Sequence, residues 1–465
     1  MTTECKQVGF EFHPLNQRQV RAQFDGGAIT SDGGGLLLRE VEKGTGILRQ
    51  FAACFTDYRD PERIEHTVPE LVAQRVYGLA LGYEDLNDHD QLRKDPLLAV
   101  LVEKSDPGQQ VLAGKSTLNR LELTKSTVSA QERYKKIVLD HGAVDRLLVD
   151  LFLQAHRSAP EQIILDLDAT DDPLYGKQEG RFFHGYYGHY CYLPLYIFCG
   201  EFLLGARLRS SNLDAAAGSV EELQRIVQQI RSAWPQVGII VRGDSGFCRE
   251  ELMAWCESES VDYLLGLAKN ERLQAAIQEP MRQAEGLHRQ SGQAARVFHE
   301  FVYQTRESWS RARRVVAKAE YLEKGANPRF IVTSLGPELW PAQPLYEKHY
   351  CARGDMENRI KEQLMLFSDR TSTAFLRSNQ LRLLFFLCRL RFAADVAATG
   401  TGRHRVRLGA VRHHSAEAAQ DRSPNPHYGA QGVGCAGRGL SLCGVVPPDS
   451  CQAVDPAAQV LNQPD

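Results

Sequence analysis

Two short apolar segments, each ending in an aspartate, constrain the fold more than any other feature of the sequence. Residues 162–168 are QIILDLD and residues 237–244 are VGIIVRGD, and both segments are rich in β-branched side chains. Short runs of this kind predict strands that are buried in a sheet. Because sites in α/β sheets collect at strand ends, Asp168 and Asp244 are candidate site residues.

Predicted strands and helices alternate around these two strands, and this order indicates an α/β fold. We expect a hairpin, an amphipathic helix capped by Ser219, a second helix and a further strand, over residues 190–209, 218–234, 249–260 and 261–268. Residues 270–345 break this order with strands that look like a small extra sheet. We therefore expect one α/β domain over residues 156–388, with a β-rich insertion at about 270–345.

Residues 1–155 predict a mostly helical N-terminal region. The clearest helix signature covers residues 67–83, where Thr67 is the expected capping residue. Ser31 or Asp32 would cap an earlier helix. The longest apolar runs are far too short to span a membrane, and the N-terminus shows no basic stretch followed by an apolar one. We therefore expect a cytoplasmic protein.

Residues 389–465 differ in composition from the rest of the chain. Beyond Phe392 there is no Lys, Ile, Phe, Met or Trp, and Glu417 is the only glutamate. One interpretation is a flexible, weakly hydrophobic extension. We favour a second, in which GC-rich DNA is translated out of its original frame, because the change is abrupt and falls inside an apolar helix that starts near Asn379. We expect this tail to be disordered or poorly packed.

A predicted helix near residue 350 carries four side chains suited to chemistry. Residues four apart share a helix face, so Arg353, Glu357 and Lys361 align, and Tyr350 precedes Glu357 by two turns. An adjoining apolar stripe would pack this helix on the sheet and bring Glu357 to the strand ends. The alternative is a solvated face with an ordinary Arg–Glu–Lys ladder. The two strand-end aspartates favour the first interpretation.

Asp168, Asp244 and Glu357 would together form a ligand set for Mg²⁺. Hard divalent cations prefer carboxylate oxygens, and a pair of such ions can activate a water and stabilise a leaving oxygen during phosphodiester displacement. Strand alternation cannot separate Asp168 from Asp166, because both lie on one face of the strand. The acids that compete with Asp168 for the first position are Asp166, Asp171 and Asp172.

A basic strip surrounds one tryptophan in the insertion. Trp309 is accompanied by Arg311, Arg313 and Arg314, which are candidates for DNA contacts. A ring in such a strip suits a single-stranded or flipped base. The alternative is an exposed basic hairpin in which Trp309 fills its own small core. The formal net charge is −3, so any DNA-binding surface must be local.

Several motifs resemble one known family. The strand order, with an insertion before the last helix, resembles the RNase H-like catalytic domain of DDE transposases. The pattern Tyr350-x2-Arg353-x3-Glu357 resembles the signature of the insertion-sequence transposases of the group numbered four. Four stretches are together similar to the related family numbered thirteen-eighty, namely LDLDATDDPLYGKQEG, YYGHYCYLPLYIFCG, VRGDSGF and YCARGDMENRIKEQ. The similarity runs from about residue 8 to about residue 388.

The resemblance assigns roles to individual residues. It implies that Asp168, Asp244 and Glu357 are the catalytic acids and the ligands of two Mg²⁺ ions, for which Mn²⁺ is an expected substitute. Tyr350 and Arg353 carry over from the same signature as DNA-binding residues. Lys361 is a less secure match, because the lysine expected further along that helix is replaced here by a leucine, Leu364.

The implied activity is DNA transposition in a bacterium. The protein would bind the terminal inverted repeats of an insertion sequence, cleave the ends and transfer the 3′-hydroxyls to target DNA. Double-stranded DNA would be its partner, with a homodimer on the DNA and location at the nucleoid when bound. Residues 1–155 are the candidate for repeat recognition. The alternatives are a catalytically impaired DNA-binding remnant that inhibits transposition, and a structure-specific nuclease that cuts without joining.

Overall fold

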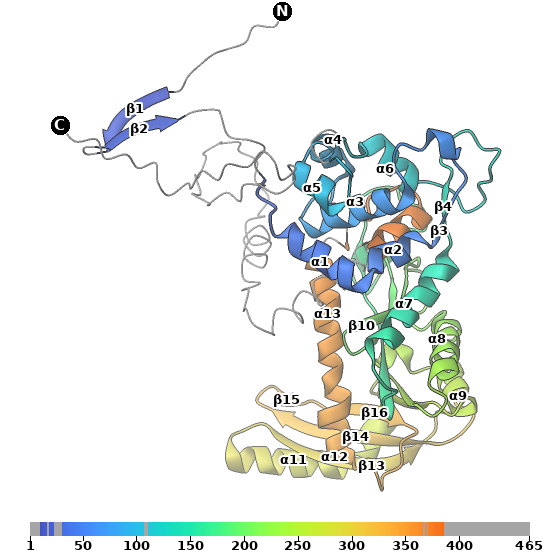
Figure 1. Cartoon of the computed structure of the whole chain (residues 1–465). Helices are drawn as coiled ribbons and strands as arrows, with labels where there is room; N and C mark the ends of the chain where they lie inside the picture. The colour runs from blue at the N-terminus through green and yellow to red at the C-terminus, as the bar shows by residue number, and fades with distance from the viewer. Residues whose placement is uncertain are drawn as a thin grey trace, which may run out of the picture.

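The computed structural model describes most of the chain up to residue 385 (Figure 1). The described residues are 10–15, 18–22, 30–106, 110–365, 368–369 and 371–385. The predicted tail, residues 389–465, lies outside the described residues. Among the described residues, no helix is both long and apolar enough to cross a membrane.

A nine-stranded mixed sheet forms the centre of the molecule, in the order β10-β9-β5-β11-β12-β16-β14-β13, with β15 paired to β14. Its first five strands are β10 (Phe202–Arg207), β9 (Leu195–Cys199), β5 (Gln162–Ala169), β11 (Gly238–Gly243) and β12 (Asp262–Leu267). Strands β5, β11 and β12 run parallel, whereas β9 and β10 form the antiparallel hairpin that the sequence predicts. The ends of β5 and β11 therefore lie side by side.

The strands of the insertion extend this sheet, so our expectation of a small extra sheet is wrong. They are β13 (Ala295–Tyr303), β14 (Arg313–Leu322), β15 (Gly325–Ala326) and β16 (Arg329–Thr333). Strand β16 pairs antiparallel with β12, from Leu264 opposite Thr333 to Leu267 opposite Phe330. This pairing satisfies the backbone hydrogen-bonding groups of both strands. In a separate sheet, the facing edges of β12 and β16 would stay unpaired. Two helices precede these strands, α10 (Glu271–Ala276) and α11 (Gln278–Ser291).

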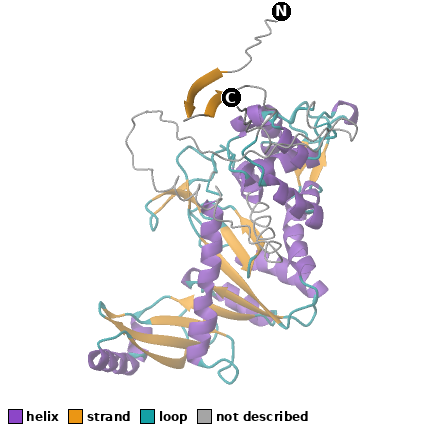
Figure 2. Ribbon diagram, turned by 60° about the vertical axis from the view of Figure 1, so that its left-hand side comes forward, coloured by secondary structure: helices purple, strands orange, loops and turns teal. Residues whose placement is uncertain are grey.

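Helices cover both faces of the sheet, as Figure 2 shows. One core contains side chains of α7 (His141–Ala155), α8 (Ser219–Ala233) and α9 (Glu250–Ser258) together with the strands. A second core joins the N-terminal helices to β9, β10 and the helical residues 376–385. Met356 and Ile360, from the predicted apolar stripe, are buried in this second core. Leu364 of the same predicted stripe is partly buried against this core, and its last member, Phe367, lies outside the described residues.

The described N-terminal region is mostly helical, as expected, with one short hairpin and one further antiparallel strand pair. Its helices before α7 are α1 (Gly35–Thr45), α2 (Ile47–Ala52), α3 (Val68–Ala80), α4 (His89–Leu92), α5 (Pro96–Leu101) and α6 (Lys115–Glu122). The hairpin pairs β1 (Phe10–Leu15) with β2 (Arg18–Ala22), and the second pair joins β3 (Phe55–Asp57) to the distant β4 (Ile137–Leu139). Thr67 caps α3 in a reciprocal capping box with Glu70, as expected.

Two predicted helix caps are wrong. Gly34, not Ser31 or Asp32, caps α1, and the Asp32 carboxylate instead accepts a hydrogen bond from the Tyr83 hydroxyl at 2.7 Å. Gly218 caps α8 with a left-handed φ of 75°, and Ser219 is already the first helical residue. Glycine takes this backbone conformation without a steric penalty, so it displaces the serine from the capping position.

The helix that carries the predicted Arg–Glu–Lys file does not begin as a regular α-helix. It follows α12 (Ala342–Pro344), a π-helical segment (Leu345–Tyr350) and a 3₁₀ segment (Cys351–Arg353) before α13 (Gly354–Met365) starts. Figures 1 and 2 show α13 running from the insertion strands towards the N-terminal helices. π-Helical turns occur frequently at functional sites, and this one contains Tyr350 and is followed directly by the 3₁₀ segment that ends at Arg353.

Candidate active site

Asp168 lies in β5 next to the strand's end and faces an arginine from the long helical segment. Its Oδ1 is 3.5 Å from Nη1 of Arg353, and both side chains are 17% exposed. Burial raises the pKa of Asp168 to about 6, Arg353 opposes this rise, and Asp244 and Glu357 add to it. Asp168 therefore feels the charges of both other predicted acids and of the predicted arginine.

Glu357 lies one helical turn beyond Arg353 and is joined to it. The distance from Arg353 Nη2 to Glu357 Oε1 is 2.6 Å, and the glutamate side chain is 40% exposed. The guanidinium therefore bridges Asp168 of the sheet and Glu357 of α13. The predicted alignment of Arg353 and Glu357 on one helix face is present, and it faces the strand ends. Lys361, one turn further along, is exposed on α13.

Asp244 follows β11 directly and caps a short 3₁₀ helix, Ser245–Phe247. Its Oδ1 accepts a hydrogen bond from the Gly246 amide at 2.8 Å. This bond holds one carboxylate oxygen at the end of the strand. Neighbouring strand β5 carries Asp168, so the parallel pairing of β5 with β11 brings the two carboxylates to the same end of the sheet.

The acids that compete with Asp168 have other partners in the structure. Both oxygens of Asp166 accept hydrogen bonds from Arg242 of the neighbouring strand β11, whose guanidinium also donates to the His349 carbonyl. Asp171 Oδ2 is 2.7 Å from His189 Nε2. Asp172 accepts a hydrogen bond from the Thr371 hydroxyl at 3.0 Å, and burial raises its pKa to about 7. Asp166, Asp171 and Asp172 therefore each have a side-chain partner outside the Asp168, Asp244 and Glu357 group.

Tyr350 approaches the site from the π-helical segment. A Cβ atom added at Gly266 of β12 would lie 2.5 Å from the Tyr350 hydroxyl and 2.9 Å from the backbone nitrogen of Ser245. Burial raises the pKa of the Tyr350 hydroxyl, with Arg353 lowering it and Asp244 raising it. The Tyr350 hydroxyl and the turn that carries Asp244 therefore both approach Gly266 closely.

Two residues that the sequence reasoning missed position this cluster. Gly266 is the one glycine within the apolar strand β12, and a glycine at such a place indicates close approach of another group. Arg242 ties Asp166 to the backbone of His349 and so holds the π-helical segment against the sheet. Its sequence signal is a lone arginine in the otherwise apolar strand β11.

The basic strip of the insertion is folded around its tryptophan. Trp309 is 6% exposed, its ring meets Tyr303 edge to face at a centroid distance of 5.7 Å, and the Arg313 guanidinium lies 5.4 Å from its centroid. The ring therefore already has packing partners. Base stacking by Trp309 stays a prediction, and it would require this packing to open.

The three arginines beside Trp309 have carboxylate partners. Arg311 pairs with Glu257 at 3.2 Å, and Arg314 pairs with Glu300 at 2.5 Å. Arg313 is buried and pairs with both Glu250 and Glu257. Only Arg311 is largely exposed, at 62% of its side chain. DNA binding by these arginines stays a prediction, because neighbouring acids already balance their charges.

The chemistry of the acid cluster suits a hard divalent cation, although Arg353 currently balances its charge. Among the described residues, no group of three or more His, Cys, Asp or Glu side chains is close enough to hold a metal ion. The donors of Asp168, Asp244 and Glu357 are all carboxylate oxygens, the type that Mg²⁺ and Mn²⁺ prefer. Mutual repulsion helps to raise the pKa of Asp168, so added positive charge would stabilise the ionised cluster.

Comparison with known proteins places the chain in a family. No curated protein matches it. The family model described as transposase DDE domain group 1 matches residues 12–394, which cover the N-terminal helices, the whole sheet with its insertion, and α13. The chain therefore belongs to this family and is a DDE-type transposase.

Proposed function

We propose that this protein cleaves the ends of an insertion sequence and joins the freed 3′-hydroxyls to target DNA, with Asp168, Asp244 and Glu357 as its catalytic acids. The observation that carries the proposal is the Arg353 bridge from Asp168 to Glu357, in the electrostatic reach of Asp244. A strand-end aspartate and a helical glutamate supply oxygen ligands for metal ions, and the arginine between them can donate hydrogen bonds to a DNA phosphate. Both are needed for phosphodiester chemistry.

We infer that the catalytic domain is RNase H-like and spans residues 156–388. The supporting observation is the order of its first five strands, in which an antiparallel hairpin flanks one edge strand of a parallel trio. The insertion at about 270–345 then continues the sheet beyond β12. Within the family, the motifs support membership of the subgroup numbered thirteen-eighty.

The three carboxylates would hold two Mg²⁺ ions or Mn²⁺ in their place. When bound, such ions lower the pKa of an attacking water and stabilise the leaving oxygen. Arg353 balances Asp168 and Glu357 in the metal-free protein, and its guanidinium is free to bind a DNA phosphate once another cation takes over that role. Tyr350 and the Asp244 turn both pack closely against Gly266, and this packing would help to fix the geometry of the site.

Double-stranded DNA at the element ends and at the target would be the partner. Two ends must be handled together, so we infer a homodimer on DNA, associated with the bacterial nucleoid. The N-terminal helical region, residues 1–155, is our candidate for recognising the inverted repeats. Lys361 is exposed on the same helix as Glu357 and is suited to contact the DNA backbone beside the acids.

A catalytically impaired DNA-binding remnant is the second candidate function. Two observations favour it: the abrupt change in composition beyond Phe392, and Arg353 between two of the three proposed ligands. Such a protein would occupy element ends and inhibit transposition. It would bind end DNA as tightly as an active enzyme, yet release no cleaved or joined product.

A cleavage and strand-transfer assay separates these functions. Labelled DNA from both flanks of the coding region is incubated with the full chain and Mg²⁺ or Mn²⁺. We expect nicked ends and joined products from the native chain, and neither from Asp168→Ala, Asp244→Ala or Glu357→Ala, with end binding retained. Glu362→Ala is the matched control, because Glu362 lies on α13 and pairs with Arg359. Binding without any product from the native chain would support the remnant; cutting without joining would support a nuclease.

A further inference from the structure

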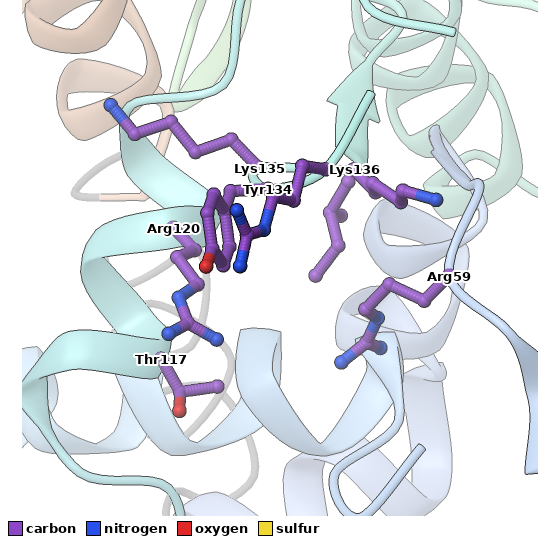
Figure 3. Close-up of a pocket in the computed structure, with 8 residues that line it drawn as sticks. Arg59, Thr117, Arg120, Tyr134, Lys135 and Lys136 are labelled. Atoms are coloured by element: carbon purple, nitrogen blue, oxygen red, sulfur yellow. The ribbon is translucent and has the colours of Figure 1, made fainter. Parts of the chain in front are cut away.

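A strongly basic pocket lies in the N-terminal region, apart from the acid cluster (Figure 3). It has a volume of about 100 Å³ and lies between α6 and the segment that leads into β4. Its lining residues are Arg59, Thr117, Arg120, Arg133, Tyr134, Lys135, Lys136 and Ile137. Five of these eight side chains are cationic, in a chain whose formal net charge is −3.

Most of this positive charge has no carboxylate partner. Arg59 is paired with Asp57, with its Nη2 2.7 Å from Oδ2. Lys136 donates to the carbonyl of Ala130 at 2.8 Å, which leaves its charge unbalanced. Across the described part of the chain, no acidic side chain forms an ion pair with the other three lining cations, Arg120, Arg133 and Lys135.

Two of the lining arginines lie near one aromatic ring. The guanidinium carbons of Arg133 and Arg120 lie 5.1 and 5.9 Å from the ring centroid of Tyr134, which is 57% exposed. Neighbouring like charges repel unless solvent or an anion screens them. Figure 3 shows Arg120 beside Tyr134, with the Thr117 hydroxyl close by and Arg59 on the opposite side. The arrangement is suited to an anion with several acceptor oxygens.

The backbone of this segment is held in an unusual conformation. Lys135 has a φ of 58°, in the left-handed region that costs a residue with a Cβ about 1 to 2 kcal/mol. Across the pocket, α6 is anchored through Glu122, which pairs with Arg75 at 2.8 Å and with Arg382 at 2.7 Å, all three side chains being largely buried. One wall of the pocket is thus fixed to the core, which preorganises it for binding.

We propose that this pocket binds a backbone phosphate of duplex DNA and so anchors the DNA on the N-terminal region, at a second point away from the acid cluster. Arginine forks match phosphate oxygens, and the hydroxyls of Thr117 and Tyr134 are further donors. The pocket holds one phosphate group, and the surrounding lysines reach the neighbouring phosphates of the same strand. The inference rests on the proposed function only in taking DNA as the phosphate source.

Duplex binding by the full chain at several salt concentrations tests this pocket. Fluorescence anisotropy is measured for Arg120→Ala, Arg133→Gln and Lys135→Asn, where asparagine tolerates the left-handed backbone. Each change should weaken binding several-fold at 100 mM salt and reduce the slope of log affinity against log salt by about 0.9 per lost contact. The loss of affinity should be the same for end DNA and for a duplex of random sequence, because contacts to phosphates do not depend on the base sequence.

Matched controls separate local charge from general charge and from misfolding. Arg282→Gln removes an exposed cation of α11, paired with Glu279, and should leave binding unchanged. Arg120→Lys keeps the charge and should recover most of the affinity that Arg120→Ala loses. The assay measures binding alone, so a failure of catalysis does not affect this test.

Two results would overturn the proposal. The first is an unchanged affinity and salt slope in all three pocket variants. The second is displacement of the DNA by 1 mM inorganic phosphate at constant ionic strength, which would mean that free phosphate is the ligand. If the pocket variants lose affinity and salt slope as predicted, and inorganic phosphate does not displace the DNA, the ligand of the pocket is a phosphate of the DNA backbone.

Discussion

Replacing Asp168 by asparagine should stabilise the metal-free protein at neutral pH while abolishing its chemistry. In the folded chain, burial and two nearby acids hold the pKa of this carboxyl at about 6, above the ordinary value of 3.8. The folded state therefore holds the proton more tightly than the unfolded state does. Stability falls as the pH rises from about 4 to about 6, and the cost is fully present above that window.

The size of the effect follows from the shift. A difference of roughly two pKa units corresponds to about 3 kcal/mol at 1.36 kcal/mol per unit. This is an upper bound for Asp168→Asn, because the substitution also takes one of the two carboxylate partners away from Arg353. We therefore expect the free energy of unfolding to rise by about 1 to 3 kcal/mol at pH 7.5 in EDTA, and the gain to vanish below pH 4.

Urea unfolding followed by tryptophan fluorescence measures this difference at each pH. Asp166→Asn is the matched control, two residues earlier on the same strand face. It removes the partner of the buried Arg242 and should cost about 3 to 5 kcal/mol. A destabilising Asp168→Asn at pH 7.5, or a gain that is independent of pH, would refute the reasoning.

Two further substitutions test the surroundings of the site. Gly266→Ala should lower end cleavage at least tenfold, because the added Cβ would lie 2.5 Å from the Tyr350 hydroxyl and 3.1 Å from the Asp244 carbonyl carbon. The control is Gly286→Ala in α11, where a Cβ meets open space, and it should leave cleavage unchanged in the same assay. Trp309→Ala should cost about 3 kcal/mol or more in urea unfolding, since the ring is buried. An abasic site in the DNA that restores its activity would instead show that the ring stacks on a flipped base.

The elements with strong local signals could be predicted from the sequence. Runs of β-branched residues ending in an acid predict β5 and β11. The cap of α3 was also predictable, because Thr67 and Glu70 stand three apart before an apolar run. These features depend on neighbouring residues alone.

Other features depend on partners far apart in the sequence. Arg242 pairs with Asp166, which lies 76 residues away in the sequence. No spacing rule predicts whether an arginine pairs with Asp166 or with Asp168, because both lie on the same face of the strand. The insertion strands join the sheet beside β12 because the edge of β12 is free to pair. The residue pattern of the insertion strands alone does not predict this position. The burial of Trp309 likewise depends on Tyr303 and Arg313, which close around it when the hairpin folds.

The central claim, that Asp168, Asp244 and Glu357 form one divalent-cation site, is tested most directly by metal-directed cleavage of the protein itself. Fe²⁺ bound in place of Mg²⁺, with ascorbate and peroxide, generates radicals that cut the nearby backbone, and mass spectrometry locates the cuts. We predict cuts close to all three residues, suppressed by excess Mg²⁺ and lost in Asp168→Ala. Cuts elsewhere in the chain, or an unchanged pattern in that variant, would contradict the claim.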